Sequence, residues 1–151
     1  MKQVPRGFTL LEILLVVAAI AILAGIVIVA INPAQQLAET RDAQRHSDVE
    51  AISSAIVQYT IKTGAYPADI PGLPGDDCPD DEENQICQEG EACDGFSLDE
   101  LVPNYIAALP IDPSQDGSEV TGYAGGLTSS NRVLICAPDT EEADELISVT
   151  R

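Results

Sequence analysis

The longest apolar segment of the chain lies near its N-terminus. Residues Ile13 to Ile31 include no charged side chain. At about 1.5 Å per residue, such a run forms a helix of just under about 30 Å, long enough to cross the hydrocarbon core of a bilayer. Glu12 immediately precedes the run. An isolated carboxylate is energetically costly in this position, so Glu12 is a candidate functional residue.

A second helical pattern follows from Pro33 to about Thr63. Asn32-Pro33 is typical of a helix start, and Gly64 predicts its end. One apolar stripe is formed at three- and four-residue steps by Val49, Ile52, Ile56 and Tyr59. The stripe predicts that the second half of this helix packs on a globular head. The first half, residues 35–46, lacks a continuous apolar face and is expected to be exposed.

Charged residues of this helix are expected to lie largely off the apolar stripe. They are Arg41, Asp42, Arg45, Asp48 and Glu50. Two interpretations stay open: a solvated helix face, or mixed-charge contacts between neighbouring chains, with Arg45 and Asp48 as one such group. His46, the single histidine, is expected to be exposed.

The rest of the chain predicts a small antiparallel sheet. Residues 67–95 are rich in Pro, Gly, Asp and Glu and show no periodicity, and residues 97–102 indicate a short capped helical turn. Three strand candidates cover residues 119–124, 132–137 and 145–150, with turns at Gly125-Gly126 and Pro138-Asp139. We therefore expect an α+β fold in which the amphipathic helix packs on this sheet.

Four segments are expected. They are a leader (residues 1–7), a transmembrane helix (8–31), an amphipathic helix (32–63) and an extracytoplasmic head (64–151). The head contains an acidic loop (67–95) and the sheet (119–150).

Acidic residues are concentrated in the head. The formal net charge is −18, and from Gly64 onward only Arg132 and Arg151 oppose twenty acidic residues. Such a surface repels nucleic-acid phosphates, so direct nucleic-acid binding is not expected. Lys2 and Arg6 precede the apolar run, and the positive-inside rule therefore predicts a single-pass protein with its N-terminus in the cytoplasm.

All four cysteines follow the apolar run: Cys78, Cys87, Cys93 and Cys136. Outside the cytoplasm disulfides are expected, and four cysteines allow three connectivities. The pairing preferred here is Cys93–Cys136 with Cys78–Cys87. A zinc site is disfavoured because no close Cys pair is present.

The first residues form a recognisable signal. A basic leader ends at Gly7, and Gly7-Phe8-Thr9-Leu10-Leu11-Glu12 leads directly into the apolar run. This stretch resembles the processing signal of type IV prepilins and type II secretion pseudopilins. The region Leu109 to Pro113, with the tyrosine-bearing strand after it, resembles more weakly the segment before the sheet in the same proteins.

The resemblance implies a precursor in the inner membrane that becomes a homo-oligomeric filament, periplasmic or at the cell surface. A prepilin peptidase and N-methyltransferase would cut between Gly7 and Phe8 and methylate Phe8, and an inner-membrane platform would assemble the subunits. Glu12 corresponds to the glutamate that meets the N-terminal amine of the neighbouring subunit. A carboxylate in low dielectric needs such a cation.

One motif points to a ligand. Asp112, Ser114 and Asp116, followed by Gly117, match the opening of a calcium loop, although Tyr123 stands where a bidentate glutamate would be needed. Major pseudopilins, which the chain resembles, bind calcium near this point. No cofactor is required by the sequence, and calcium is the one ligand it suggests; a plain turn is the alternative.

The sequence therefore predicts a structural filament subunit of a type IV pilus-like system. The alternative within the family is a pseudopilin, major or minor, of a type II secretion system. From a different class, a membrane-tethered, calcium-dependent binding module would share the anchor but never polymerise. No catalytic motif appears, and the head has no histidine to serve as a general base, so we do not expect an enzyme.

Overall fold

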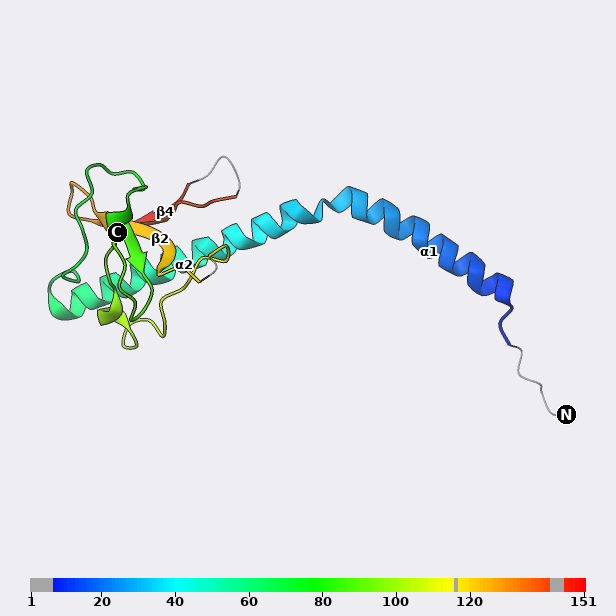
Figure 1. The fold of residues 1–151 in the computed structure, drawn as a ribbon, viewed down its shortest axis with the longest axis horizontal. Coiled ribbons are helices and arrows are strands. Elements are labelled where there is room, and N and C mark those ends of the chain that lie inside the picture. Colours follow the sequence, from blue (N-terminus) through cyan, green and yellow to red (C-terminus); the bar gives the residue numbers. More distant parts are fainter. Residues whose placement is uncertain (1–6, 116, 142–145) are drawn as a thin grey trace. The chain divides into compact units, whose positions relative to one another are not determined.

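The N-terminal unit consists of one apolar helix and its junction with the next. The computed structural model describes residues 7–115, 117–141 and 146–151, so most of the expected leader lies outside the described residues. Contacts divide the chain into two compact units, Met1–Leu37 and Ala38–Arg151. Helix α1 (Leu10–Ile31, blue in Figure 1) has no buried residue.

The junction between the helices is a single asparagine. Asn32 ends α1 in the left-handed conformation with φ 42°, a conformation that Asn tolerates better than most residues. Its carbonyl oxygen accepts hydrogen bonds from the amides of Gln35 and Gln36 in the first turn of α2 (Pro33–Thr63). Pro33 suits the first helical position because no partner is needed for an amide there. Gly25 stays inside α1.

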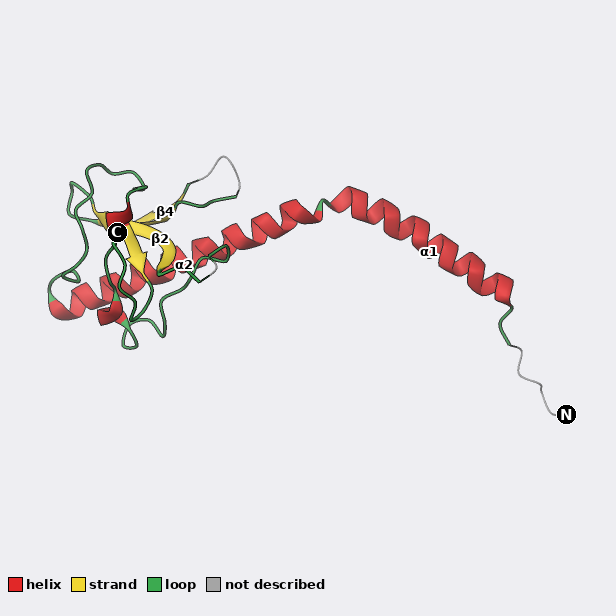
Figure 2. Cartoon of the chain, in the orientation of Figure 1, coloured by secondary structure: helices red, strands yellow, loops and turns green. Residues whose placement is uncertain are grey.

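The second unit, Ala38–Arg151, includes most of α2 and is called the head from here on. It is built on a four-stranded antiparallel sheet in the order β1-β2-β3-β4 (yellow in Figure 2). The strands are β1 (Gln85–Cys87), β2 (Val120–Leu127), β3 (Val133–Ala137) and β4 (Ile147–Thr150). Single 3₁₀ turns, η1 (Glu82–Asn84) and η2 (Asp99–Leu101), lie in the connections. The expected α+β fold, a helix packed on a small antiparallel sheet, is confirmed.

The core lies between α2 and one face of the sheet. Val49, Ile52 and Ile56 of the predicted apolar stripe are fully buried, and Tyr59 packs at the edge. The sheet and loops contribute Ile86, Phe96, Leu98, Leu101, Tyr123, Val133, Ile135, Ala137 and Ile147. Gly64 follows the helix with φ 85°, a backbone conformation that glycine adopts without strain. The packing predicted from the amphipathic stripe is therefore confirmed.

The preferred disulfide pairing is wrong. The bonds are Cys78–Cys136 and Cys87–Cys93, and no cysteine is free among the described residues. Side chains alternate along β3, so Cys136 points away from the face that holds Ile135. There it joins a second cluster with Ala124 and Leu134, against which Cys78 of the acidic loop packs. The loop therefore covers the outer face of the sheet.

Gly125 and Gly126 do not form the expected turn. Both lie inside β2, opposite Ile135 and Leu134 of β3. A Cβ atom on Gly125 would lie 2.5 Å from the carbonyl oxygen of Leu134, and one on Gly126 would lie 2.8 Å from the side chain of Leu73. These glycines are thus needed for close packing on both faces, and β2 continues to Leu127.

Two further expectations need correction. Strand β1 lies within residues 67–95, for which no regular structure was expected. It has only three residues, too few to show a strand periodicity in the sequence, and its pairing with β2 shifts register between Gln85 and Cys87. In the capped turn, Ser97 and Glu100 have the spacing of a capping box, but Ser97 Oγ accepts its hydrogen bond from the amide of Asp99 and not from that of Glu100.

Candidate functional site

The processing signal lies at the start of α1. Gly7 and Phe8 are exposed and precede the helix, and nothing lies within 4 Å of a Cβ atom built on Gly7. The bond between these two residues is therefore in exposed, non-helical chain. A protease needs such a conformation because an amide bond inside a helix is held by its hydrogen bonds.

Thr9 and Glu12 define the first turn of α1. Thr9 is the N-cap, and its Oγ1 accepts a hydrogen bond of 3.2 Å from the amide of Glu12. The Thr-x-x-Glu spacing is that of a capping box, so the start of this helix could have been predicted from the sequence. The cap fixes Glu12 in the first turn, where the helix dipole favours a negative charge.

Beyond Glu12, α1 offers only apolar surface. Its 22 residues have the length and the apolar composition to cross a membrane. Large side chains such as Leu14, Ile22 and Ile28 are at least 60% exposed. Burial of this surface therefore depends on lipid or on other protein chains.

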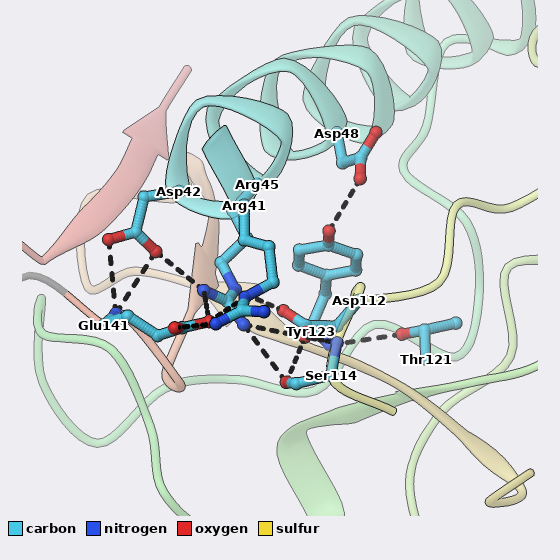
Figure 3. Close-up of polar contacts among 9 residues, drawn as sticks. All are labelled: Arg41, Asp42, Arg45, Asp48, Asp112, Ser114, Thr121, Tyr123 and Glu141. Carbon is cyan, nitrogen blue, oxygen red and sulfur yellow. Dashed lines mark hydrogen bonds and ion pairs between the residues drawn. The ribbon is translucent and has the colours of Figure 1, made fainter. Parts of the chain in front are cut away.

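The second candidate site is a charged cluster in the head, centred on Arg45 of α2 (Figure 3). Arg45 is fully buried. Its Nε and Nη2 donate to the two carboxylate oxygens of Asp112, at 2.6 and 2.9 Å. Its Nη1 donates to Asp42 at 2.7 Å and to Glu141 at 3.2 Å, and Nη2 also donates to Ser114 at 3.1 Å. One guanidinium thus joins α2 to two distant segments of the chain.

The acidic partners are themselves held in place. Both Asp112 and Ser114 lie in one turn, where the Ser114 amide donates to Asp112 Oδ1 at 2.8 Å. The Asp112 amide donates to the carbonyl of Thr121 in β2 at 2.8 Å. Arg41 forms a bidentate ion pair with Glu141, whose amide donates to Asp42 at 3.2 Å.

Gly122 allows the Asp112 turn to approach β2. Its φ is 84°, and a Cβ atom there would lie 2.7 Å from Cβ of Asp112 and 2.7 Å from Cγ of Gln115. Any other residue would be strained in this conformation and would push the turn away. The glycine therefore helps to set the distance between Asp112 and the helix.

These contacts shift the pKa values in consistent directions. Burial opposes ionisation of Asp112, but the hydrogen bonds from Arg45 and Ser114 outweigh it, and its pKa lies below the ordinary value of 3.8. The hydrogen bonds from Arg41, helped by Arg45, likewise lower the pKa of Glu141. The carboxylate of Asp112 raises the pKa of Arg45 further above its already high value. The cluster is therefore charged at neutral pH.

Tyr123 contacts the same helix one turn further on. Its hydroxyl donates to Asp48 at 2.7 Å, and the ring is fully buried. Burial, followed by the Asp48 carboxylate, raises the pKa of this phenol. The expected grouping of Arg45 with Asp48 is thus wrong, because each has its own partner on the sheet side.

Arg45 and Asp42 are the residues that sequence reasoning misplaced. Position 45 precedes Val49 by four residues, and Val49 precedes Ile52 by three, so Arg45 continues the apolar stripe on the same helix face. Asp42 extends that face by a further three residues and is only 8% exposed. The three- and four-residue spacing of Asp42, Arg45 and Val49 was the sequence signal that could have predicted the burial of the two charged side chains. His46 is exposed, as expected.

The structure describes two of the three proposed calcium ligands. Asp112 and Ser114 are brought together, whereas Asp116 lies outside the described residues. Within the described part of the chain, no group of three or more His, Cys, Asp or Glu side chains could hold a metal ion. The oxygens of Asp112 and Ser114 face the Arg45 guanidinium.

Comparisons with known proteins agree with the N-terminal signal. The family model described as "Prokaryotic N-terminal methylation motif" matches residues 4–28. The chain is 27% identical over 140 residues to "Type II secretion system core protein G" of Escherichia coli (strain K12), covering 93% of this chain and 86% of that protein. No solved structure matches significantly.

A protein with the same description from Klebsiella michiganensis is 35% identical over 72 residues, covering 48% of this chain and 49% of that protein. The methylation motif, the similarity along most of the chain and the helix-on-sheet fold agree with one another. Together they support a type IV pilin or pseudopilin.

Proposed function

We propose that this protein is the structural subunit of a type IV pilus-like filament, polymerised through α1 after cleavage between Gly7 and Phe8. The observation that carries the proposal is that α1 buries none of its residues in its own chain. Such an apolar surface needs lipid before assembly and neighbouring helices afterwards. The matched methylation motif supports the processing step.

Glu12 is the residue proposed to direct assembly. Among the residues that the structure describes, no cation pairs with its carboxylate, although it lies next to the most apolar part of the chain. Cleavage after Gly7 creates a new amine at Phe8. That amine, methylated by the processing enzyme, would supply the missing positive charge to Glu12 of a neighbouring subunit, because a carboxylate in low dielectric is stabilised by a cation.

The precursor is proposed to span the inner membrane once. Lys2 and Arg6 favour a cytoplasmic N-terminus. Its partners would be a prepilin peptidase and N-methyltransferase, an inner-membrane assembly platform and further copies of the chain. The role is structural, and no catalytic step is assigned to it.

The filament is either a surface pilus or the pseudopilus of a type II secretion machine. The two relatives, both described as type II secretion system core protein G, favour the pseudopilus. The disulfide Cys78–Cys136, which holds an acidic loop on the outer face of the sheet, suits a subunit exposed at the cell surface. Location distinguishes the two.

Intact mass in two fractions of the host's cells tests the proposal. Wherever the protein is found, we expect a chain that begins at Phe8 and is heavier by one methyl group. Abundance in material sheared from the surface indicates a pilus, and confinement to membranes indicates a pseudopilus or a minor subunit. A chain that keeps its leader in both fractions contradicts the proposal.

The Glu12→Ala variant separates a filament subunit from a tethered binding module. We expect E12A to insert into the membrane but to leave the filament fraction, because the amine of Phe8 loses its partner. The matched control is Leu11→Ala, which shortens an exposed apolar side chain in the same turn. If E12A assembles as well as L11A, Glu12 does not direct assembly.

A further inference from the structure

The buried guanidinium of Arg45 is the most unusual group in the head. Burying a cation is strongly unfavourable unless it is paired and fully hydrogen-bonded. Arg45 meets this requirement with carboxylates from three segments, contributed by Asp42, Asp112 and Glu141. It therefore cross-links the helix, the turn before β2 and the segment before β4, which is what a bound metal ion does in other small domains.

The same turn carries the calcium-like pattern, so the two cations compete for the same oxygens. Calcium binds carboxylate oxygens at about 2.3–2.6 Å, with several ligands around one point. Both oxygens of Asp112 accept hydrogen bonds from Arg45, at 2.6 and 2.9 Å, and Ser114 Oγ lies 3.1 Å from Nη2. A calcium ion held between both oxygens of Asp112 on the face that Arg45 contacts would overlap the guanidinium. Asp112 and Ser114 therefore do not offer this face to calcium while Arg45 is in place.

The charges lead to the same conclusion. Asp42, Asp112 and Glu141 supply three negative charges, and Arg41 and Arg45 supply two positive ones, so the cluster carries a net charge of −1. Adding a divalent cation to the intact cluster would place it beside a buried guanidinium, which repels it. If Arg45 is removed, a divalent ion would instead bring the net charge to zero.

We infer that Arg45 takes the place of a calcium ion in this head, so that the head is independent of calcium while Arg45 is present and becomes responsive to calcium when Arg45 is removed. This inference does not rest on the proposed filament function, because it concerns only contacts within the head.

Thermal unfolding of the full chain in detergent tests the inference. Near-ultraviolet circular dichroism of the tyrosines reports on the head, since Tyr123 is buried in its core. For the wild-type protein we expect the same Tm in chelator and in millimolar calcium. Any change in Tm caused by magnesium at the same concentration is subtracted first. Magnesium is the control for weak binding to the acidic surface.

The Arg45→Ala variant provides the complementary measurement. It leaves a buried aspartate without its cation, so in chelator we expect Tm to fall by about 10 °C or more. Calcium, but not magnesium, should restore a large part of this loss. Arg41→Ala is the matched control: it lies one turn away and pairs with Glu141, and its side chain is 31% exposed. It should lose little stability and gain none selectively from calcium.

Two results would overturn the inference. The first is saturable calcium binding to the wild-type protein in equilibrium dialysis, with selective stabilisation that disappears in Asp112→Asn. The second is a folded R45A variant on which calcium and magnesium have equal effects. If R45A does not fold, Arg45→Gln replaces it, since glutamine keeps a hydrogen-bonding group but removes the charge. The wild-type measurement is decisive in either case.

Discussion

The apolar helix and the head differ in whether their main charged side chain is paired within the chain. In the head, Arg45 is surrounded by carboxylates of the same chain and hydrogen-bonded to them. In α1, Glu12 has its amide capped by Thr9, while its carboxylate forms no ion pair with any residue that the structure describes. One charge is paired within the chain, and the other has no ion-pair partner among the described residues, as the assembly role proposed for Glu12 would require.

Apolar surface follows the same division. The head buries its large side chains between α2 and the sheet and behind the acidic loop, whereas α1 leaves all of its own exposed. The head therefore has the features of a domain that is stable by itself. Helix α1 has the features of an element that is stable only in a membrane or in an assembly. The predictions below test this difference, from the largest expected effect to the smallest.

The two disulfides should contribute unequally to the stability of the head. Cys78–Cys136 closes a loop with a sequence separation of 58, and Cys87–Cys93 one with a separation of 6. Loop-closure entropy predicts that replacing the first pair by serine costs about 4 kcal/mol of unfolding free energy and replacing the second about 2 kcal/mol. Denaturant unfolding of the two double variants measures the costs, and equal losses would contradict the entropic argument.

Matched truncations in the two regions should have different effects. Ile56→Ala removes a fully buried side chain from the head and should lower its unfolding free energy by about 3 kcal/mol. Ile22→Ala removes the same atoms from α1, where Ile22 is 66% exposed, and should leave unfolding of the head unchanged. Unfolding in detergent, followed by the tyrosine signal, compares the variants. A comparable loss in both would mean that α1 supports the head.

The features that could be predicted from the sequence are those that depend on residues close together in the chain. The stripe from Val49 to Tyr59 predicted the packed face of α2, and Gly7 to Glu12 predicted the resemblance to pilins that the comparisons support. Both patterns could be recognised because helix periodicity and a linear recognition signal involve residues close together in the chain.

Long-range partners were beyond such reasoning. Arg45 and Asp112 are 67 residues apart and Cys78 and Cys136 are 58 apart, and both pairs depend on how the sheet is covered. The tandem glycines of β2 were assigned to a turn because glycine is common there. Their actual role is close packing, of Gly125 against Leu134 of β3 and of Gly126 against Leu73 of the acidic loop, and both contacts are long-range.

Loss of the hydrogen bond from Tyr123 to Asp48 should have the smallest effect on stability, and this effect should depend on pH. Tyr123→Phe keeps the ring in the core and removes the hydroxyl, which should cost about 1 kcal/mol at neutral pH. The folded-state pKa of Tyr123 is raised above 10, so its neutral form is favoured in the native state. Above pH 10 the unfolded chain releases this proton while the folded one retains it, and the tyrosine's contribution decreases as pH rises.

The stability gap between the wild-type protein and Y123F should therefore be constant from neutral pH to about pH 9 and should narrow above pH 10. Tyr66→Phe is the control, because the Tyr66 hydroxyl donates to the carbonyl of Asn131 at an exposed position. Subtracting its profile removes the general effect of alkaline pH on this acidic head. If the difference in stability between the wild-type protein and Y123F stays constant above pH 10, the pKa of Tyr123 is not raised in the folded state. Water would then reach its hydroxyl, and this side of the head would not be closed to solvent.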